Sequence, residues 1–243
     1  MIDRQIYGNL NTFVFMRIIL TSPTTLEIKP LLGSFGIDDL SVGKLINVKD
    51  GSVDMDILIS GIGMLSTAYY LGKMLNRSYN MAFQLGIAGS FSKDYPPGSV
   101  LHVSSDCIAE LGVEEKDHFI PAAEMNIGIY PELLFEKSWL HNRNVANIQA
   151  VLNLKQVKSI TVNTVHGQQA SVNKLKKLYD PVLETMEGAA FLFACKDLDI
   201  ACAQIRTVSN YVKRRDLQEW DMKLAVKTLS DFANMMLDEI KQQ

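Results

Sequence analysis

The segment VDMDILISGIGMLSTAYYLGKMLN, residues 53–76, decides the fold class. It begins with a short apolar run, passes through Gly61 and Gly63, and continues into a stretch with helical spacing. Such a run predicts a buried strand followed by a glycine turn and a helix. This strand–turn–helix unit is the repeating element of α/β folds.

Other segments on both sides continue the alternation. Apolar strands are predicted at 16–22, 81–91, 98–111, 158–167 and 200–210. Helices are predicted for QASVNKLKKLY and for the C-terminal 220–243, where an apolar face recurs every three to four residues at Ala225, Leu229, Phe232, Met236 and Ile240. Strands that alternate with helices in this way predict a three-layer α/β fold.

Length and composition favour a single domain. The chain has 243 residues, of which 47% are hydrophobic and 21% charged, which suits one large core better than two small ones. The predicted domain spans 16–243, because Met16 opens the first clear strand. Residues 1–15 form an N-terminal extension without the charged head, long apolar run and cleavage site of a secretion signal.

Several classes of function are disfavoured by composition. The net charge is −3 and the basic residues are scattered, so no nucleic-acid groove is expected. A membrane span is not indicated either, since no run of about 18 apolar residues occurs. The four histidines are far apart, which argues against a metal site. Three cysteines in apolar stretches indicate a reduced, cytoplasmic protein: Cys107, Cys195 and Cys202.

The position of a ligand site follows from the predicted strands. In open α/β sheets, ligands collect at the carboxyl ends of the strands. Applied to this chain, the rule selects the beginning of a helix near Glu187 and five loops: Ser22 to Glu27, Gly61 to Met64, Gly86 to Ser90, Asn163 to Gly167, and Ser209 to Arg215.

The glycines in two of these loops can have a structural role in a turn or a functional role beside a ligand. In GIAGS, residues 86–90, the glycines would let backbone N–H groups approach a ligand, and they would equally suit a tight turn. Neither a dinucleotide fingerprint nor a P-loop is present. In GIG, residues 61–63, the structural interpretation is favoured.

Acidic and amide side chains also lie in the selected loops. Glu187, in LETMEGAA, can be a first-turn acid favoured by the helix dipole or an acceptor for the two hydroxyls of a ribose. The small residues after it would let the helix end approach the ligand. Glu27 can be a general base or an exposed loop acid. Asn210 has arginines nearby that would hold a ligand carboxylate or form a solvated cluster.

Together, these motifs resemble the nucleoside phosphorylase and nucleosidase superfamily over about residues 17–240. LETMEGAA resembles its ribose-binding motif, LGIAGS its glycine loop, and the acid in SPTTLEI the water-orienting acid of the nucleosidases. Within the superfamily the chain most resembles the futalosine hydrolases, through GIGMLSTAYYLGK, AELGVEEKDHF, ITVNTVHG and IRTVSNYVKRRD. The resemblance implies a three-layer α/β/α sandwich with a mixed central sheet.

The same resemblance implies roles for the residues of the sugar side. Glu27 would polarise the attacking water, and Glu187 would accept hydrogen bonds from the ribose hydroxyls. Met186 would help to hold the ribose. The backbone of the glycine loop would line the water and ribose side at Ile87, Ala88 and Gly89.

On the base side, the resemblance implies that Asn210 faces the purine and that Thr164 and Val165 help to wall the base pocket. Adenine nucleosidases carry an aspartic acid where this chain has Asn210. Because an amide cannot act as a general acid, Asn210 favours a 6-oxopurine leaving group. Arg215 matches an arginine of the SNYVxxR pattern and is a candidate for the carboxylated 5′ arm of futalosine. Arg214 stands where a proline is expected.

The implied activity is N-glycoside hydrolysis through an oxocarbenium-like transition state, without a metal or organic cofactor. The alternatives are a purine nucleoside phosphorylase, an adenine nucleosidase for methylthioadenosine or S-adenosylhomocysteine, and a non-catalytic nucleoside-binding protein. The first loop, TSPTTLEI, carries an acid in place of the cations that phosphate needs. The resemblance also implies a homodimer or small homo-oligomer.

Overall fold

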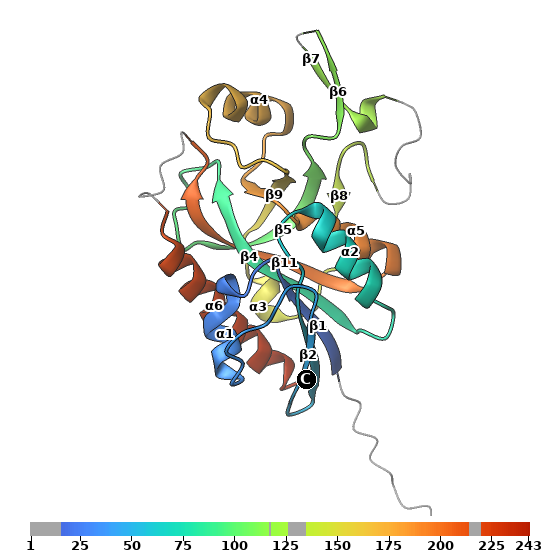
Figure 1. Cartoon of the computed structure of the whole chain (residues 1–243), viewed down its shortest axis with the longest axis vertical. Coiled ribbons are helices and arrows are strands. Elements are labelled where there is room, and N and C mark those ends of the chain that lie inside the picture. The colour runs from blue at the N-terminus through green and yellow to red at the C-terminus, as the bar shows by residue number, and fades with distance from the viewer. Residues whose placement is uncertain (1–15, 117, 126–134, 214–219) are drawn as a thin grey trace, which may run out of the picture.

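The computed structural model describes residues 16–116, 118–125, 135–213 and 220–243 (Figure 1). The predicted N-terminal extension, residues 1–15, lies outside these ranges, as do Arg214 and Arg215.

A large mixed sheet forms the centre of the described chain. Its main path runs β10-β9-β5-β11-β4-β1-β3-β2, and β8 pairs with β5. The strands of the sheet are β1 (Met16–Ser22), β2 (Leu45–Asp50), β3 (Val53–Ile59), β4 (Met81–Ser90), β5 (Val100–Ile108), β8 (Leu140–His141), β9 (Gln156–Thr161), β10 (Leu183–Thr185) and β11 (Ala201–Tyr211). Both parallel and antiparallel pairs occur, as expected for a mixed sheet.

One half of the sheet curls round on itself. The short strand β10 pairs in parallel with β9 and also antiparallel with the end of β4, where Leu183 faces Ser90 and Glu184 faces Gly89. Strands β4, β11, β5, β9 and β10 therefore form a closed ring of neighbours. This closure gathers the carboxyl ends of β4, β9 and β11 around one space.

Helices cover both faces of the sheet (Figure 1). Their bounds are α1 (Lys29–Ser34), α2 (Met64–Met74), α3 (Gln149–Leu152), α4 (Gln169–Tyr179), α5 (Gly188–Leu198) and α6 (Met222–Ile240), with short 3-10 turns η1 (Leu26–Ile28) and η2 (Ala122–Glu124). Residues of α1, α3 and α6 share one hydrophobic cluster, and those of α2 and α5 share another on the opposite face. The predicted three-layer α/β/α arrangement is confirmed.

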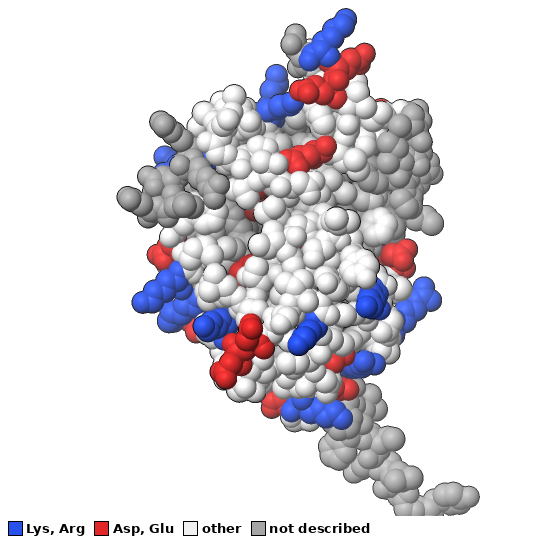
Figure 2. Space-filling model, in the orientation of Figure 1, with Lys and Arg blue, Asp and Glu red and all other residues white. Residues whose placement is uncertain are grey.

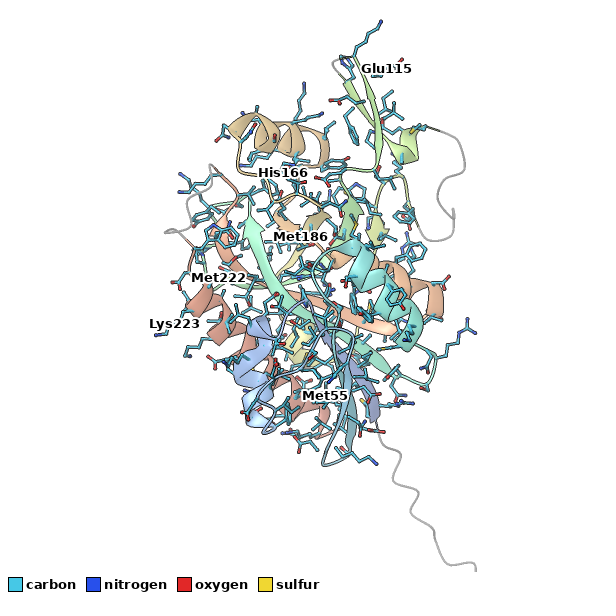
Figure 3. All side chains as sticks on the ribbon, viewed as in Figure 1. Met55, Glu115, His166, Met186, Met222 and Lys223 are labelled. Carbon is cyan, nitrogen blue, oxygen red and sulfur yellow. The ribbon has the colours of Figure 1, made fainter. Side chains whose placement is uncertain are left out.

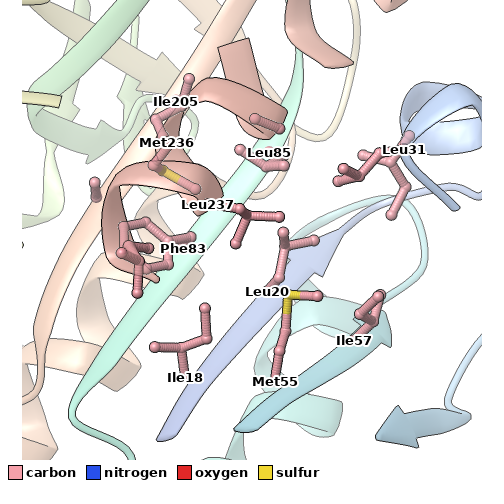
Figure 4. Packing of buried hydrophobic residues seen from close by; sticks show 14 of the residues in the cluster. Ile18, Leu20, Leu31, Met55, Ile57, Phe83, Leu85, Ile205, Met236 and Leu237 are labelled. Atoms are coloured by element: carbon pink, nitrogen blue, oxygen red, sulfur yellow. The ribbon is translucent and has the colours of Figure 1, made fainter. Parts of the chain in front are cut away.

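Strand alternation explains these two clusters. Ile18 and Leu20 point into the α1/α6 layer, whereas Ile19 between them points into the α2/α5 layer. Figure 4 shows the first of these layers, in which Phe83 of β4 packs with Met236 of α6. Because the central strands are covered on both sides, they need near-continuous apolar runs, which is the pattern that made them predictable.

Residues 112–155, for which the sequence predicts neither a helix nor a strand, contain more structure than expected. They hold β8, α3 and a separate hairpin of β6 (Gly112–Glu115) and β7 (His118–Pro121). The hairpin projects at the top of Figure 1, beyond the sheet. Half of its strand residues are exposed and only Pro121 is buried, so the hairpin lacks the apolar alternation by which a strand is predicted.

Candidate active site

A cavity of about 230 Å³ opens at the carboxyl ends of the strands. Each of the five loops selected from the sequence contributes to its lining, and so does Glu187. The lining residues from these segments include Pro23, Glu27, Ile62, Ile87, Ala88, Gly89, Val165, His166, Ser209 and Asn210. The rule that ligands collect where parallel strands end therefore located the cavity correctly.

Glu27 lies in η1, and its carboxylate is buried and firmly held. Oε2 accepts the backbone N–H of Ile87 at 2.9 Å, and Oε1 accepts the hydroxyl of Thr24 at 2.8 Å. Burial raises the pKa of Glu27 to about 7, against the opposing effects of the Ile87 N–H and the Arg206 charge. A carboxylate with this pKa is suited to proton transfer near neutrality.

Arg206, in the middle of β11, brings a positive charge beneath the two acids of the cavity. Its side chain is fully buried, and Nη2 donates to Gln84 Oε1 at 2.7 Å. Nη1 lies 3.5 Å from Glu187 Oε2 and, within the described chain, has no hydrogen-bond partner. A Cβ at Gly86 would collide with Nη1 and lie 3.0 Å from Glu27 Oε2. Gly86 therefore gives room to the arginine rather than forming a turn, and β4 continues through residue 90.

Glu187 occupies the N-cap of α5, but its side chain makes no cap hydrogen bond. Oε1 accepts the backbone N–H of Gly63 at 3.0 Å, so the carboxylate is turned toward the start of α2 and the cavity. Gly63 has a φ of 90°, which favours glycine. The dipole interpretation of Glu187 therefore does not account for its orientation. The small residues after it serve packing, since a Cβ on Gly188 would collide with Gln204 and Asp106 of the sheet.

Asn210 reaches the cavity through an irregularity in β11. The register between β11 and β4 shifts between Val208 and Asn210, which places Asn210 opposite Gly89. Bulges of this kind re-aim side chains near active sites. The hydroxyl of Ser209 donates to Asn210 Oδ1 at 2.8 Å, and Nδ2 donates to the carbonyl of Tyr211 at 3.1 Å. The amide keeps one donor and one acceptor position for a ligand.

A third acid lines the same cavity. Glu184 of β10 accepts the backbone N–H of His166 through Oε1 at 3.1 Å. Its Oε2 lies 2.8 Å from Nδ1 of the same histidine. His166 and Met186 lie between α4 and α2 in the view of Figure 3. On the far side of the ring, His166 Nε2 is 3.9 Å from Glu110 Oε1.

Comparison with known proteins assigns the chain to a family. The family model of the phosphorylase superfamily matches residues 18–240, nearly the whole chain. The chain belongs to the phosphorylase superfamily. Among curated members, it is 30% identical to a futalosine hydrolase of Acidothermus cellulolyticus over 182 residues, 72% of this chain and 71% of that protein. It is 27% identical to a futalosine hydrolase of Thermus thermophilus over 183 residues, 75% of this chain and 80% of that protein.

Solved structures share the fold of this superfamily member. A methylthioadenosine/S-adenosylhomocysteine nucleosidase of Helicobacter pylori, complexed with a nucleoside analogue, superposes with a TM-score of 0.75 at 19% identity, covering 93% of this chain and 99% of that one. A futalosine hydrolase of Helicobacter pylori superposes with a TM-score of 0.72 at 20% identity, covering 93% and 98%. At these identities the likeness shows the fold alone.

Most site residues that the superfamily resemblance implied lie around the cavity. The acids Glu27 and Glu187 and the amide of Asn210 line it, as do Met186, Val165 and the backbone segment 87–89. Thr164 is exposed and is not part of the lining. Arg215 lies outside the described residues.

Sequence reasoning missed two features of the site. Arg206 appeared only as one of several arginines near Asn210, yet it lies alone in the apolar run IACAQIRTVSN, which is the signal of a buried and partnered charge. The contact between His166 and Glu184 joins residues 18 positions apart, and no spacing rule predicts it.

Among the residues that the structure describes, no group of three or more His, Cys, Asp or Glu residues is arranged to hold a metal ion. No helix among them is long and apolar enough to cross a membrane.

Proposed function

We propose that this chain is a futalosine hydrolase, an N-glycosidase that cleaves futalosine into hypoxanthine and dehypoxanthine futalosine in menaquinone synthesis. The curated relatives carry that name. The observation that carries the proposal is the convergence of Glu27, Glu187 and Asn210 on one cavity of about 230 Å³. Glu27 would bind the attacking water, Glu187 the ribose and Asn210 the 6-oxopurine.

The ribose would lie against Glu187. Its Oε1 already accepts the N–H of Gly63, and Oε2 is turned to Arg206, so each oxygen keeps a lone pair for a hydroxyl. Two neighbouring hydroxyls on the sugar are matched by two oxygens of one fixed carboxylate. Met186, next in the chain, also lines the cavity and would contact the sugar ring.

The attacking water would lie next to Glu27. The raised pKa allows this carboxylate to accept a proton from the water near neutral pH. Arg206 Nη1, which has no hydrogen-bond partner in the described chain, supplies a buried positive charge beside the same carboxylate. The base would lie at Asn210, where the amide meets N7 and the 6-oxo group of the purine.

In the reaction, the bond between the sugar anomeric carbon and purine N9 breaks, and its electron pair goes to the purine. Positive charge develops on the sugar, where Glu187 stabilises it. The water oxygen forms the new bond to the anomeric carbon while its proton passes to Glu27. The 6-oxo group spreads the negative charge of the leaving base, which then takes a proton from solvent water to become neutral hypoxanthine, so no strong general acid is needed at Asn210.

Hydrolysis is favoured over phosphorolysis by charge. A phosphate nucleophile needs cations or N–H donors around its position. Here the position beside the anomeric carbon is faced by Glu27, whose carboxylate would repel phosphate. Arg206, the cation beside Glu27, already faces Glu187 and Gln84.

The 5′ arm of futalosine would leave the ribose toward the open side of the cavity. Lys213 and Trp220 line that cavity on either side of the segment 214–219, which the structure does not describe. Arg215 remains the proposed partner of the carboxylate, with Lys213 as a second cation in the lining.

We also propose that the enzyme is cytoplasmic and forms a homodimer or small homo-oligomer. Cys107, Cys195 and Cys202 are free and buried, as suits a reducing compartment. On α2, Leu65 is 87% and Tyr69 61% exposed, and Phe193 of the contacting helix α5 is 37% exposed. Figure 2 shows few charged side chains in the middle of this face. A second copy covering α2 and α5 would bury this apolar surface.

The test is to incubate the purified chain with futalosine, inosine or methylthioadenosine, each with and without phosphate, and to follow free base by chromatography. Phosphate-independent release of hypoxanthine from futalosine is expected. Release that requires phosphate would indicate a phosphorylase, and adenine from methylthioadenosine an adenine nucleosidase. Binding without any release of base would indicate a non-catalytic protein.

A further inference from the structure

Helix α5 begins directly after Glu187, and a residue from another element caps its first turn. Ala189, the second residue of the helix, donates its backbone N–H to the hydroxyl of Thr161 at 2.8 Å. Thr161 is the last residue of β9 and is fully buried. The first N–H groups of a helix have no partner inside it, and the side chain of the preceding residue commonly accepts one of them. Here that preceding residue is Glu187, whose side chain makes no such bond.

Asp106 of β5 fixes the direction of the Thr161 hydroxyl. The hydroxyl donates to Asp106 Oδ1 at 2.8 Å, so its lone pairs are left to accept the N–H of Ala189. Gln204 Nε2 donates to the other oxygen, Oδ2, at 3.2 Å. A Cβ on Gly188 would collide with Oδ2, so the carboxyl group of Asp106 packs directly against the first turn of α5.

The charge of Asp106 suits this place. Burial raises its pKa to about 6, against the opposing effects of the bonds from Thr161 and Gln204 and of the Arg206 charge. At neutral pH the group is therefore mainly ionised and can only accept hydrogen bonds. The helix dipole favours a negative charge at the beginning of a helix. Thr161 and Asp106 together thus supply both the acceptor and the charge that the first turn of α5 needs.

The carboxylate of Glu187 is turned away from its own helix. Oε1 accepts the N–H of Gly63 at 3.0 Å, and Oε2 lies 3.5 Å from Arg206 Nη1. A buried N–H without a partner is costly, and an acid at the beginning of a helix is attracted to such groups. If the Thr161 hydroxyl were removed, the N–H of Ala189 would lose its acceptor and would draw the nearby carboxylate of Glu187 toward the helix.

We propose that Thr161, oriented by Asp106, is a positioning residue that caps α5 in place of Glu187 and so leaves the Glu187 carboxylate directed to the ribose. Neither Thr161 nor Asp106 lines the cavity, so both act through Glu187 and not on the substrate. This inference rests on the proposed function, because it presumes that Glu187 binds the hydroxyls of a ribose.

The experiment measures how strongly the reaction depends on the 2′-hydroxyl of the sugar. The ratio of kcat/KM for futalosine to kcat/KM for its 2′-deoxy analogue is determined for each variant. The intrinsic reactivities of the two substrates are the same throughout, so only the change in this ratio is interpreted. Thr161→Val, which has the same shape without the hydroxyl, is expected to lower the ratio about 10-fold, the value of one charge-assisted hydrogen bond. Thr161→Ser keeps the hydroxyl and should stay within about twofold of wild type.

Two results would overturn the proposal. The first is a Thr161→Val ratio within about twofold of wild type, including the case in which kcat/KM falls equally for both substrates, as a purely structural role predicts. The second is an equal decrease in Thr161→Ser, because the hydroxyl would then not be the cause. If Thr161→Val does not fold, Thr161→Ala removes the same hydroxyl with a smaller side chain, and its ratio is interpreted in the same way.

Thr207→Val is the matched control. Thr207 of β11 is also fully buried, but its hydroxyl has no hydrogen-bond partner among the described residues. The same substitution there removes no cap from α5, so the ratio should stay at the wild-type value.

A second measurement tests whether the effect passes through Glu187. Glu187→Gln is combined with Thr161→Val, and the double variant is expected to keep the ratio of Glu187→Gln alone, because two changes that remove one interaction are not additive. A further decrease would show that Thr161 acts by another route and would overturn the proposal. Failure of the proposed function is distinguishable, because the wild-type chain would then release no hypoxanthine from futalosine before any variant is tested.

Discussion

Replacing Glu27 with glutamine is predicted to abolish activity and to stabilise the folded protein above neutral pH. The carboxylate is buried, and its pKa rises from 4.5 to about 7. The folded state therefore binds this proton more tightly than the unfolded state does. The contribution to stability is complete below about pH 4.5 and is lost as the pH rises through 7.

The magnitude follows from the size of that shift. About 2.5 pKa units at 1.36 kcal/mol each amount to about 3 kcal/mol of unfolding free energy, which ionised Glu27 costs the wild-type protein at pH 8. Glutamine avoids this cost and keeps both contacts, since its oxygen can accept from Ile87 N–H and its NH₂ can donate to the Thr24 hydroxyl.

The assay is thermal unfolding of wild type and Glu27→Gln at pH 5 and pH 8. At pH 8 the variant is expected to melt about 6 to 12 °C higher, and at pH 5, close to the ordinary pKa of a glutamate, the difference should fall to about a quarter of that. Activity should fall by about 100-fold or more, because the general base is lost. Glu114→Gln, at an exposed glutamate, is the control for the substitution itself. A melting difference that is equal at both pH values would refute the argument.

Three further predictions concern the same site. In the wild type, kcat/KM for futalosine should rise with pH and level off above about 7, as Glu27 ionises; a flat profile between pH 5.5 and 8.5 would contradict its role as base. Asn210→Asp should raise kcat/KM for the 6-amino analogue of futalosine relative to kcat/KM for futalosine itself, because a carboxyl group can protonate N7 of an adenine. An unchanged ratio in a steady-state assay would exclude this. Gly86→Ala should destabilise the fold by about 1 to 3 kcal/mol in denaturant titrations, since its Cβ would collide with Arg206, whereas Gly33→Ala, with no atom within 4 Å of the new Cβ, should not.

The central layers of the fold were predictable because their signals are local. The helix 169–179 and the strand 16–22 were placed with the bounds that the structure shows. The strand is marked by consecutive apolar residues and the helix by apolar residues three to four positions apart, and a turn signal ends each. Strand β2 was missed because it alternates between exposed and half-buried positions, with none of its residues fully buried, and half of its residues are polar or charged.

Strand β10 could not be predicted from the local sequence. It has three residues, too few for any periodicity, and it is a strand because Leu183 and Glu184 pair with the end of β4 some 94 positions earlier. That pairing closes the ring of strands and places Glu184 beside Gly89. The bulge that aims Asn210 into the cavity depends on the same two-sided pairing of β4.

The sequence by itself determined the α/β class, the loops that form the cavity and two of the acids in it, Glu27 and Glu187, because a strand end, a glycine and a carboxylate are each visible at one position of the chain. Only the tertiary structure decided that Arg206 lies beneath Glu187, that Gly86 makes room for that arginine, and that His166 holds Glu184. These are contacts between separate strands and loops. Their partners are chosen by strand register and burial, which no single segment of the chain encodes.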